Sequence, residues 1–402
     1  MKSRFGFALA ASVAVAATAG AASAEEVKFG FLGGVTGPIE SLVPPIIDGA
    51  KLAFDEVNEQ GGLLGGMTAT MVVADTTCAD ATKAADAADR LVNSEKVVAI
   101  VGALCSGATI SAANNASVPG GVAMISPAST SPAISTLDDK DLLFRTAVSD
   151  AYQGEVLSRL IASTGAKNVV MTFVNNDYGK GLSDAIAAAF PKTGGTIAAS
   201  VAHEDGKADY RPELGQLSGA GATDLVIIGY ADGSGGTVLR QAIESGDFER
   251  YYSADGMVSD KIAAGLGKEL EGKFVMTKPG TPEIPGADSF KKLATDAGIK
   301  ADGVFVPNAY DAAFILALAT EKAGSVDRAA IAKAVREVAS PPGEIILPGE
   351  WKKAADLIKA GKDVNYEGAT GSNDFDAAGD VLTVFLRTEI KDGKVVELGI
   401  AE

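Results

Sequence analysis

The sequence predicts an α/β protein of two lobes, each built on a parallel sheet with helices on both faces. Short apolar runs of strand length alternate with segments in which apolar residues recur at helical spacing. The alternation begins again near residues 142–146, and 402 residues are enough for two domains. We therefore expect two doubly wound sheets.

Residues 1–24 have the composition of a secretory signal peptide. Lys2 and Arg4 make a basic tip, residues 5–17 are apolar, and Ala22-Ser23-Ala24 is a small-residue cleavage site. No later run reaches the roughly 18 to 20 apolar residues that a membrane helix needs. The sequence thus predicts a soluble, exported protein that begins at Glu25.

The first half of the chain alternates strictly between strand and helix patterns. The helix expected over residues 45–60 carries Ile46, Ala50, Phe54 and Val57 on one face and stops at Gly61-Gly62. Further helices are expected over 80–93 and from Ser106, between strands at 27–32, 69–74, 97–102 and 122–125.

The second half repeats this alternation. The patterns predict helices over 150–163, 181–190, 211–220 and 235–245. They predict strands over 168–174, 196–202 and 224–230, with short strands near Tyr251 and 274–276. Helices beginning at Asp288, Asn308 and Asp327 have no strands long enough for a third sheet, so we expect them to cover the first lobe. The tail, 381–389 and 395–398, predicts a hairpin.

Two strand ends carry the candidate binding residues. The stretches 97–107 and 122–132 are apolar runs that end in small hydroxyl residues, among them Ser106 and Thr130. Ligands of open α/β sheets lie at the carboxyl ends of strands, and a hydroxyl beside free N–H groups suits a carboxylate. The alternative is that Ser106 and Thr130 are ordinary helix caps.

Cys78 and Cys105 are the only cysteines, and each follows a predicted strand. An even count in an exported protein favours a disulfide, whose ends would meet if the two strands are neighbours in one sheet. Closing this loop is worth about 3 to 4 kcal/mol on a chain-entropy model. A metal site or a thiol nucleophile would need partners, and His203, the single histidine, lies in a polar stretch.

Other classes of function have little support in the sequence. A net charge of −17 with no basic stripe argues against nucleic acid as a partner. The loops 33–37 and 233–236 match neither the dinucleotide nor the P-loop pattern, and no G-x-S-x-G elbow is present. We expect no enzyme activity, no cofactor and no metal site.

Seven short motifs in order resemble one family, the type I periplasmic solute-binding proteins of ABC transporters that bind leucine, isoleucine and valine. They are Gly37-Pro38-Ile39, Gly61-Gly62-Leu63, Cys78, Leu104-Cys105-Ser106, Ile125 to Thr130, Asn176 to Gly181, and Tyr310-Asp311-Ala312. The resemblance implies two doubly wound parallel-sheet lobes joined by three crossover segments. It implies an N-terminal lobe of 25–146 and 278–377 and a C-terminal lobe of 147–277 and 378–402.

The resemblance also implies ligand-binding residues at matching positions. Ser106, Ala128 and Thr130 would hold the ligand carboxylate, with Ser129 and Leu104 beside them. Tyr178 and Tyr230 would form the second-lobe wall and Tyr310 part of the first-lobe wall. Asp255, in Ser253-Ala-Asp255-Gly256, would take the ligand ammonium, where the family has a longer glutamate.

The match departs from the family at the ligand side chain, and several alternatives stay open. Leu42 follows Gly-Pro-Ile in place of a large aromatic, so other amino acids, small carboxylates or amides remain candidates. Asp255 could be a turn residue, the tyrosines could cover core edge, and Glu40 and Asp232 could be solvated loop charges. The resemblance implies a periplasmic monomer that delivers an amino acid to an ABC permease, with a sensory module as the rival.

Overall fold

The computed structural model describes residues 25–401, so the predicted signal peptide lies outside the described residues. The first lobe is built on a five-stranded sheet of order β2-β1-β3-β4-β5, in which every pair is parallel. Its strands are β1 (Glu26–Gly33), β2 (Thr68–Asp75), β3 (Ala99–Val101), β4 (Ala123–Ser126) and β5 (Leu143–Arg145). Its helices are α1 (Val43–Glu59), α2 (Ala81–Asp89) and α3 (Ser106–Ala112), the last two extended by π turns Arg90–Ser94 and Ala113–Ser117.

The second lobe contains a seven-stranded sheet of order β15-β14-β10-β9-β8-β6-β7. Its strands are β6 (Asn168–Val174), β7 (Thr196–His203), β8 (Asp224–Ile228), β9 (Arg250–Ser253), β10 (Phe274–Pro279), β14 (Phe385–Lys391) and β15 (Lys394–Ile400). Its helices are α4 (Asp150–Ser163), α5 (Asp177–Ala189), α6 (Arg211–Ser218), α7 (Ser234–Ser245) and α8 (Asp260–Leu270). The first five strands are parallel, and the predicted C-terminal hairpin adds two antiparallel strands. The predicted α/β fold of two sheets is confirmed, with a mixed rather than purely parallel second sheet.

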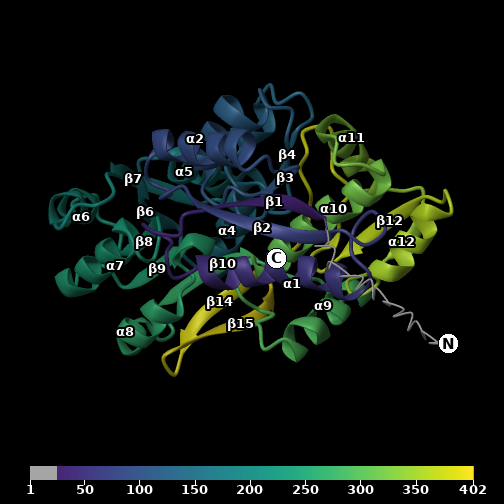
Figure 1. Cartoon of the computed structure of the whole chain (residues 1–402). Helices are drawn as coiled ribbons and strands as arrows, with labels where there is room; N and C mark the ends of the chain where they lie inside the picture. Colours follow the sequence, from purple (N-terminus) through teal and green to yellow (C-terminus); the bar gives the residue numbers. More distant parts are fainter. Residues whose placement is uncertain (1–24, 402) are drawn as a thin grey trace, which may run out of the picture.

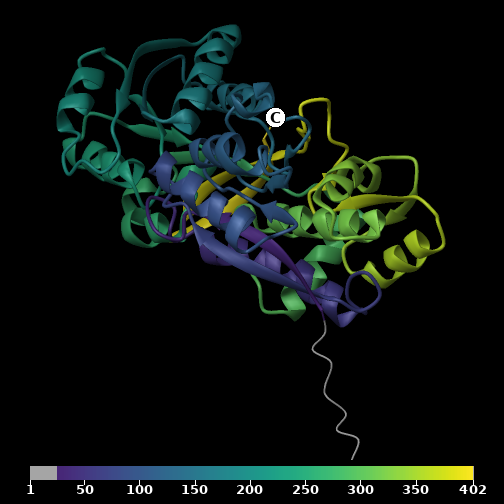
Figure 2. The ribbon, with the colours of Figure 1, turned by 45° about the horizontal axis from the view of Figure 1, so that its top comes forward.

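The segment after β10 returns to the first lobe (Figures 1 and 2, green to yellow). It holds α9 (Pro285–Asp296), α10 (Val306–Ala323), α11 (Arg328–Ala339) and α12 (Trp351–Lys359). The expectation that no third sheet forms is wrong, because β11 (Glu344–Ile346), β12 (Val364–Gly368) and β13 (Gly371–Ser372) make a small three-stranded sheet. These strands are two to five residues long, too short for a period-two pattern to stand out.

The chain passes between the two sheets after β5, after β10 and again over residues 376–384 before β14. Figure 2 shows the second lobe, in teal, beside the first lobe and its green and yellow helices. The ligand site can therefore lie between two bodies that three segments join. The lobe boundaries stay a prediction.

The disulfide Cys78–Cys105 is present, with a Cα–Cα distance of 5.5 Å. The strands that precede the cysteines are not neighbours, since β1 lies between β2 and β3. Thr77 and Cys78 adopt left-handed φ values of 55° and 61°, which turn the loop after β2 back toward Cys105. The predicted disulfide is confirmed, although the strands that precede its two cysteines are not neighbours in the sheet.

Within the described residues, no helix is long and apolar enough to cross a membrane.

Candidate functional site

A small cavity lies between the two lobes. Its lining comes from the segments that follow strands of both sheets, from α1 and from Phe305, the residue before α10 (Val306–Ala323). The lining residues are Ile39, Leu42, Ile46, Leu104, Cys105, Ser106, Ala128, Thr130, Tyr178, Tyr230, Asp255, Gly256 and Phe305. The structure thus brings together eight residues that the sequence pointed to: Leu42, Leu104, Ser106, Ala128, Thr130, Tyr178, Tyr230 and Asp255.

Ser106 and Thr130 form a polar corner on the first-lobe wall. Ser106 is the first residue of α3, and its Oγ accepts the N–H of Ser131 at 3.2 Å. That bond uses a lone pair and leaves the Ser106 hydroxyl proton free to be donated. Thr130 differs, because its Oγ1 donates to Asp150 Oδ2 at 2.8 Å. The Thr130 hydroxyl therefore keeps only lone pairs for a ligand, which suits a cation rather than a carboxylate.

Ser129 supports this corner from behind and does not line the cavity. Its Oγ bonds Thr109 Oγ1 at 2.6 Å and donates to the carbonyl oxygen of Ala103 at 3.1 Å. Ser126 Oγ accepts the N–H of Ser129 at 3.0 Å, which closes a tight turn after β4. These bonds hold Ala128 and Thr130 at the cavity while turning Ser129 into the lobe.

Tyr178 and Tyr230 form the second-lobe wall, with ring centroids 5.1 Å apart and planes inclined by 21°. Asn176 caps α5 by accepting the N–H of Gly179 at 2.9 Å, which sets Tyr178 on the first turn. Gly179 has no room for a side chain, because a Cβ would lie 2.0 Å from the carbonyl oxygen of Val174. The Asn-Asp-Tyr-Gly motif thus positions the tyrosine ring.

Asp255 is 3% exposed and faces the polar corner across the cavity. The Tyr178 hydroxyl donates to its Oδ1 at 3.4 Å, whereas its Oδ2 has no hydrogen-bond partner among the described residues. Burial raises the pKa of Asp255 to about 6. The following Gly256 is required, since a Cβ there would lie 2.5 Å from the carbonyl oxygen of Gly229. Asp255 is thus a buried acid with an unused acceptor, not only a turn residue.

Asp150 is a second buried acid that sequence analysis missed. It is fully buried at the first residue of α4, behind Thr130, and its Oδ1 lacks a partner among the described residues. Burial and the nearby charge of Asp255 raise its pKa well above the usual value. Its contact with the site depends on the loop after β4 meeting the first turn of α4, where the N–H of Asp150 donates to the carbonyl oxygen of Thr130 at 2.8 Å. Asp255 and Asp150, together with the lone pairs of Thr130, make the space between Thr130 and Asp255 attractive to a cation.

The rest of the lining is apolar and comes from the first lobe. Ile39, Leu42, Ile46 and Leu104 surround it, and Phe305 adds an aromatic ring. Phe305 adopts a left-handed φ of 61° just before α10, a conformation that bulky residues rarely take. No sequence signal marked it, because its contact with the site depends on how α10 packs. An aromatic is therefore present, although none follows Gly-Pro-Ile.

Tyr310 does not line the cavity, and the expectation that it forms part of the wall does not match its placement. Its hydroxyl donates to Glu56, and its ring lies 5.7 Å from that of Phe314 inside the first lobe. Residue 310 is on the second turn of α10, one turn beyond Phe305, and faces α1 instead of the ligand. The Tyr310-Asp311 motif serves the structure of this lobe.

Asp232 was a candidate for a solvated loop charge, but the structure shows it bonded to two other residues. Its Oδ2 accepts the backbone N–H of Ser41 at 2.9 Å and the Ser41 hydroxyl at 2.5 Å, and Lys261 Nζ lies 2.9 Å from Oδ1. Ser41 belongs to the first lobe and Asp232 to the second, so this is a contact between the lobes. Glu40 is exposed.

Fold and cavity together define a two-lobed ligand-binding protein whose site is shared by both lobes. No group of three or more potential metal ligands occurs in residues 25–401. The periplasmic binding protein family model matches residues 26–383, and the chain belongs to this family.

Relatives and solved structures point to the branched-chain amino acid group of that family, which confirms the resemblance. The chain is 30% identical to the leucine-, isoleucine-, valine-, threonine- and alanine-binding protein of Pseudomonas aeruginosa, over 78% of this chain and 83% of that one. It is 28% identical to a chemotactic substrate-binding protein of Halobacterium salinarum, over 85% and 81% of the two chains. The structure resembles a leucine-binding protein from Thermotoga maritima, with a TM-score of 0.79, 25% identity and coverage of 94% and 99%.

Proposed function

We propose that the protein is the substrate-binding component of an ABC importer and captures a small amino acid with an apolar side chain. The observation that carries the proposal is the opposition of Ser106 and Asp255 across one cavity. Ser106 has a hydroxyl proton to donate, and Asp255 has a buried, unused carboxylate oxygen. An α-amino acid places an anion and a cation a few bonds apart, which suits this pair.

Each end of the ligand has its own residues in this proposal. The carboxylate lies against Ser106 and the backbone at Ala128 and Thr130. The ammonium lies between Asp255 Oδ2 and the lone pairs of Thr130 Oγ1, with Asp150 behind them. Thr130 was first expected to hold only the carboxylate. Because its hydroxyl already donates a proton to Asp150, we assign its backbone to the carboxylate and its Oγ1 lone pairs to the ammonium. The side chain lies against Leu42, Leu104 and Phe305.

Capture follows closure of the lobes. The open form exposes the polar corner of the first lobe, and the second lobe then brings Asp255, Tyr178 and Tyr230 over the bound ligand. The boundaries near residues 146, 278 and 377 divide the two moving bodies. We propose that the protein works as a periplasmic monomer, performs no chemistry on its ligand, and presents the closed form to a membrane permease.

A sensory role is the second candidate, favoured by the similarity to the chemotactic protein of Halobacterium salinarum. Both roles need the same cavity, so ligand binding does not separate them. A transport defect for the ligand in a deletion strain supports the importer, whereas a chemotaxis defect with normal uptake supports the sensor.

A thermal-shift screen followed by calorimetry tests the binding function. We expect leucine, isoleucine or valine to raise the melting temperature, because a ligand that binds only the folded state stabilises it. Isocaproate and isopentylamine are matched probes that lack the ammonium or the carboxylate of leucine. Both should bind at least about 30-fold more weakly, since each leaves a buried group unpaired. Equal binding of isocaproate and leucine would contradict the role of Asp255.

A further inference from the structure

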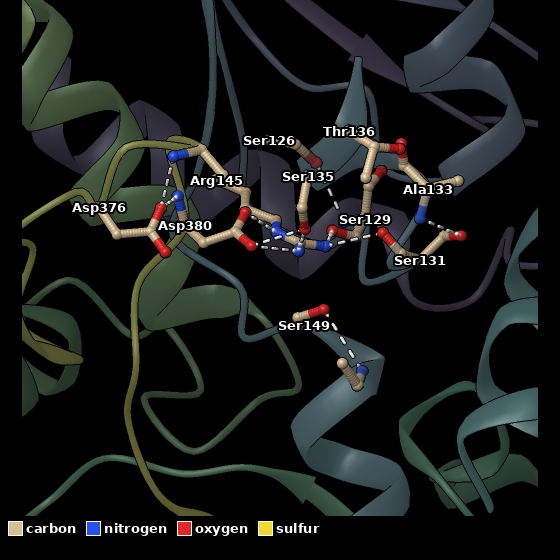
Figure 3. Close-up of polar contacts among 12 residues, drawn as sticks. Ser126, Ser129, Ser131, Ala133, Ser135, Thr136, Arg145, Ser149, Asp376 and Asp380 are labelled. Atoms are coloured by element: carbon tan, nitrogen blue, oxygen red, sulfur yellow. Dashed lines mark hydrogen bonds and ion pairs between the residues drawn. The ribbon is translucent and has the colours of Figure 1, made fainter. Parts of the chain in front are cut away.

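Arg145 is a fully buried arginine at the end of β5, where the chain leaves the first lobe. Its guanidinium lies between Asp380 and the loop 129–135 (Figure 3). Nε donates to Asp380 Oδ1 at 2.6 Å and Nη2 donates to Oδ2 at 2.8 Å. This bidentate pair compensates a charge that has no contact with water.

The same guanidinium also holds the loop that faces the ligand. Nη1 donates to the carbonyl oxygens of Ser131 at 3.0 Å and Ser129 at 3.4 Å. Nη2 donates to Ser135 Oγ at 2.8 Å. Ser129 and Ser131 flank Thr130, so these bonds orient the peptide groups that present Thr130 to the cavity.

Asp380 belongs to the third passage between the lobes, which is fastened to β5. Asp376 Oδ1 accepts the N–H groups of Ala378 at 2.8 Å and Asp380 at 3.0 Å, and the N–H of Arg145 donates to the carbonyl oxygen of Gly379 at 3.0 Å. Gly379 has a φ of 75°, and a Cβ there would lie 2.5 Å from the carbonyl oxygen of Leu143. A glycine at position 379 thus allows the turn 376–380 to approach β5 closely.

We propose that Arg145 and Asp380 are positioning residues that couple the ligand-facing loop to the third passage between the lobes. Neither residue lines the cavity. Residues 376–384 continue into β14 of the second lobe, so a shift of that segment as the lobes move reaches Ser129 and Ser131 through the guanidinium. The inference rests on the proposed capture of an amino acid and adds that the geometry of the polar corner depends on the state of the hinge.

The test compares Asp380 with Asp224, because each aspartate forms a bidentate pair with an arginine. Asp380→Asn weakens the pair with Arg145. Asp224→Asn weakens a bidentate pair with Arg250, at 2.6 and 2.8 Å, that lies in the second lobe away from the cavity. We expect both variants to melt at lower temperature. The Kd for whichever of leucine, isoleucine and valine binds the parent most tightly should rise at least tenfold in Asp380→Asn and stay within twofold in Asp224→Asn.

Hydrogen exchange of ligand-free protein gives a second readout that needs no ligand. Amides of residues 129–135 should lose protection in Asp380→Asn and keep it in Asp224→Asn. Parent-like affinity and protection in Asp380→Asn would overturn the coupling. If the parent binds no amino acid, the proposed function is wrong, while the exchange data still decide the coupling.

A milder variant covers the case in which Asp380→Asn does not fold. Ser135→Ala removes one acceptor from Arg145 and one donor to Asp380 Oδ2, which it contacts at 2.7 Å. As in Asp380→Asn, it should lower the protection of residues 129–135 and weaken ligand binding, here by about threefold in Kd. No change in either measurement would also overturn the proposal.

Discussion

Asp255 and Asp311 are both buried aspartates, but their surroundings differ in the number of hydrogen bonds. Asp311 accepts bonds from the Tyr366 hydroxyl at 2.7 Å, the N–H of Ala369 at 2.8 Å, and the N–H and hydroxyl of Thr370 at 2.9 and 2.6 Å. Asp255 accepts one long bond, and its Oδ2 has no partner among the described residues. The oxygens of Asp311 are satisfied within the first lobe and stabilise it, whereas Asp255 lines the cavity and its Oδ2 is unpaired among the described residues.

The sharpest way to break this comparison is to truncate Asp255. Asp255→Ala should weaken ligand binding by about 2 to 5 kcal/mol, because the buried ammonium loses its counter-charge. The free energy of unfolding without ligand should stay the same or rise, since an uncompensated buried charge is removed. Calorimetric titration and urea denaturation measure the two quantities, and parent-like affinity would remove Asp255 from the site.

Truncation of Asp311 should have the opposite effect to that of Asp255, with a large loss of stability and little change in ligand affinity. Asp311→Ala leaves the donors of Tyr366, Ala369 and Thr370 unpaired in the interior, which should lower the free energy of unfolding by about 3 kcal/mol. Ligand affinity of the folded fraction should change less than about threefold, because Asp311 lies outside the cavity lining. A large loss of affinity with unchanged stability would contradict the contrast between the two aspartates.

Changing the pH separates the contribution of Asp255 to ligand affinity from its contribution to the stability of the ligand-free protein. Its pKa in the folded protein is raised to about 6, so below this pH it becomes neutral and amino acid affinity should fall, by up to tenfold per pH unit. Its contribution to the stability of ligand-free protein has the opposite sign. Between about pH 4 and 6 the folded state holds the proton more tightly than the unfolded state, so this contribution grows as pH falls.

Asp255→Asn is the control for this pH dependence. The amide does not titrate, so the variant should bind more weakly at pH 7 and show no inflection near pH 6. An inflection that persists in Asp255→Asn would assign the pH dependence to Asp150 or to another group.

The smallest expected effect concerns the hydrogen bond that the Tyr178 hydroxyl donates to Asp255. Tyr178→Phe removes the 3.4 Å hydrogen bond to Oδ1 and keeps the ring that stacks on Tyr230. Affinity should change by about 0.5 to 1 kcal/mol, because the bond is long and the ammonium contributes most of the pairing. Tyr230→Phe is the matched control. A loss of affinity in Tyr178→Phe as large as that in Asp255→Ala would mean that the Tyr178 hydroxyl contacts the ligand directly.

Sequence reasoning located the polar corner because its signals are local. Ser106 and Thr130 follow apolar strand runs directly, and the ends of parallel strands meet at one edge of a sheet. The resemblance added Asp255, Tyr230 and Tyr178, which follow strands of the other lobe, Tyr178 on the first turn of α5. It also suggested Tyr310, for which the structure shows partners inside the first lobe, since one helical turn decides whether a residue of α10 faces the ligand or α1.

The sequence alone therefore determined the alternation of strands and helices, the two sheets, the cysteine pair and the residues at the strand ends, because each depends on neighbours a few positions away. Tertiary structure decided the roles of Asp150, Phe305, Arg145 and Asp311. Whether a buried charge is paired depends on partners such as Asp380, which lies 235 positions from Arg145. Periodicity does not encode such distances, and only the packed chain brings those groups together.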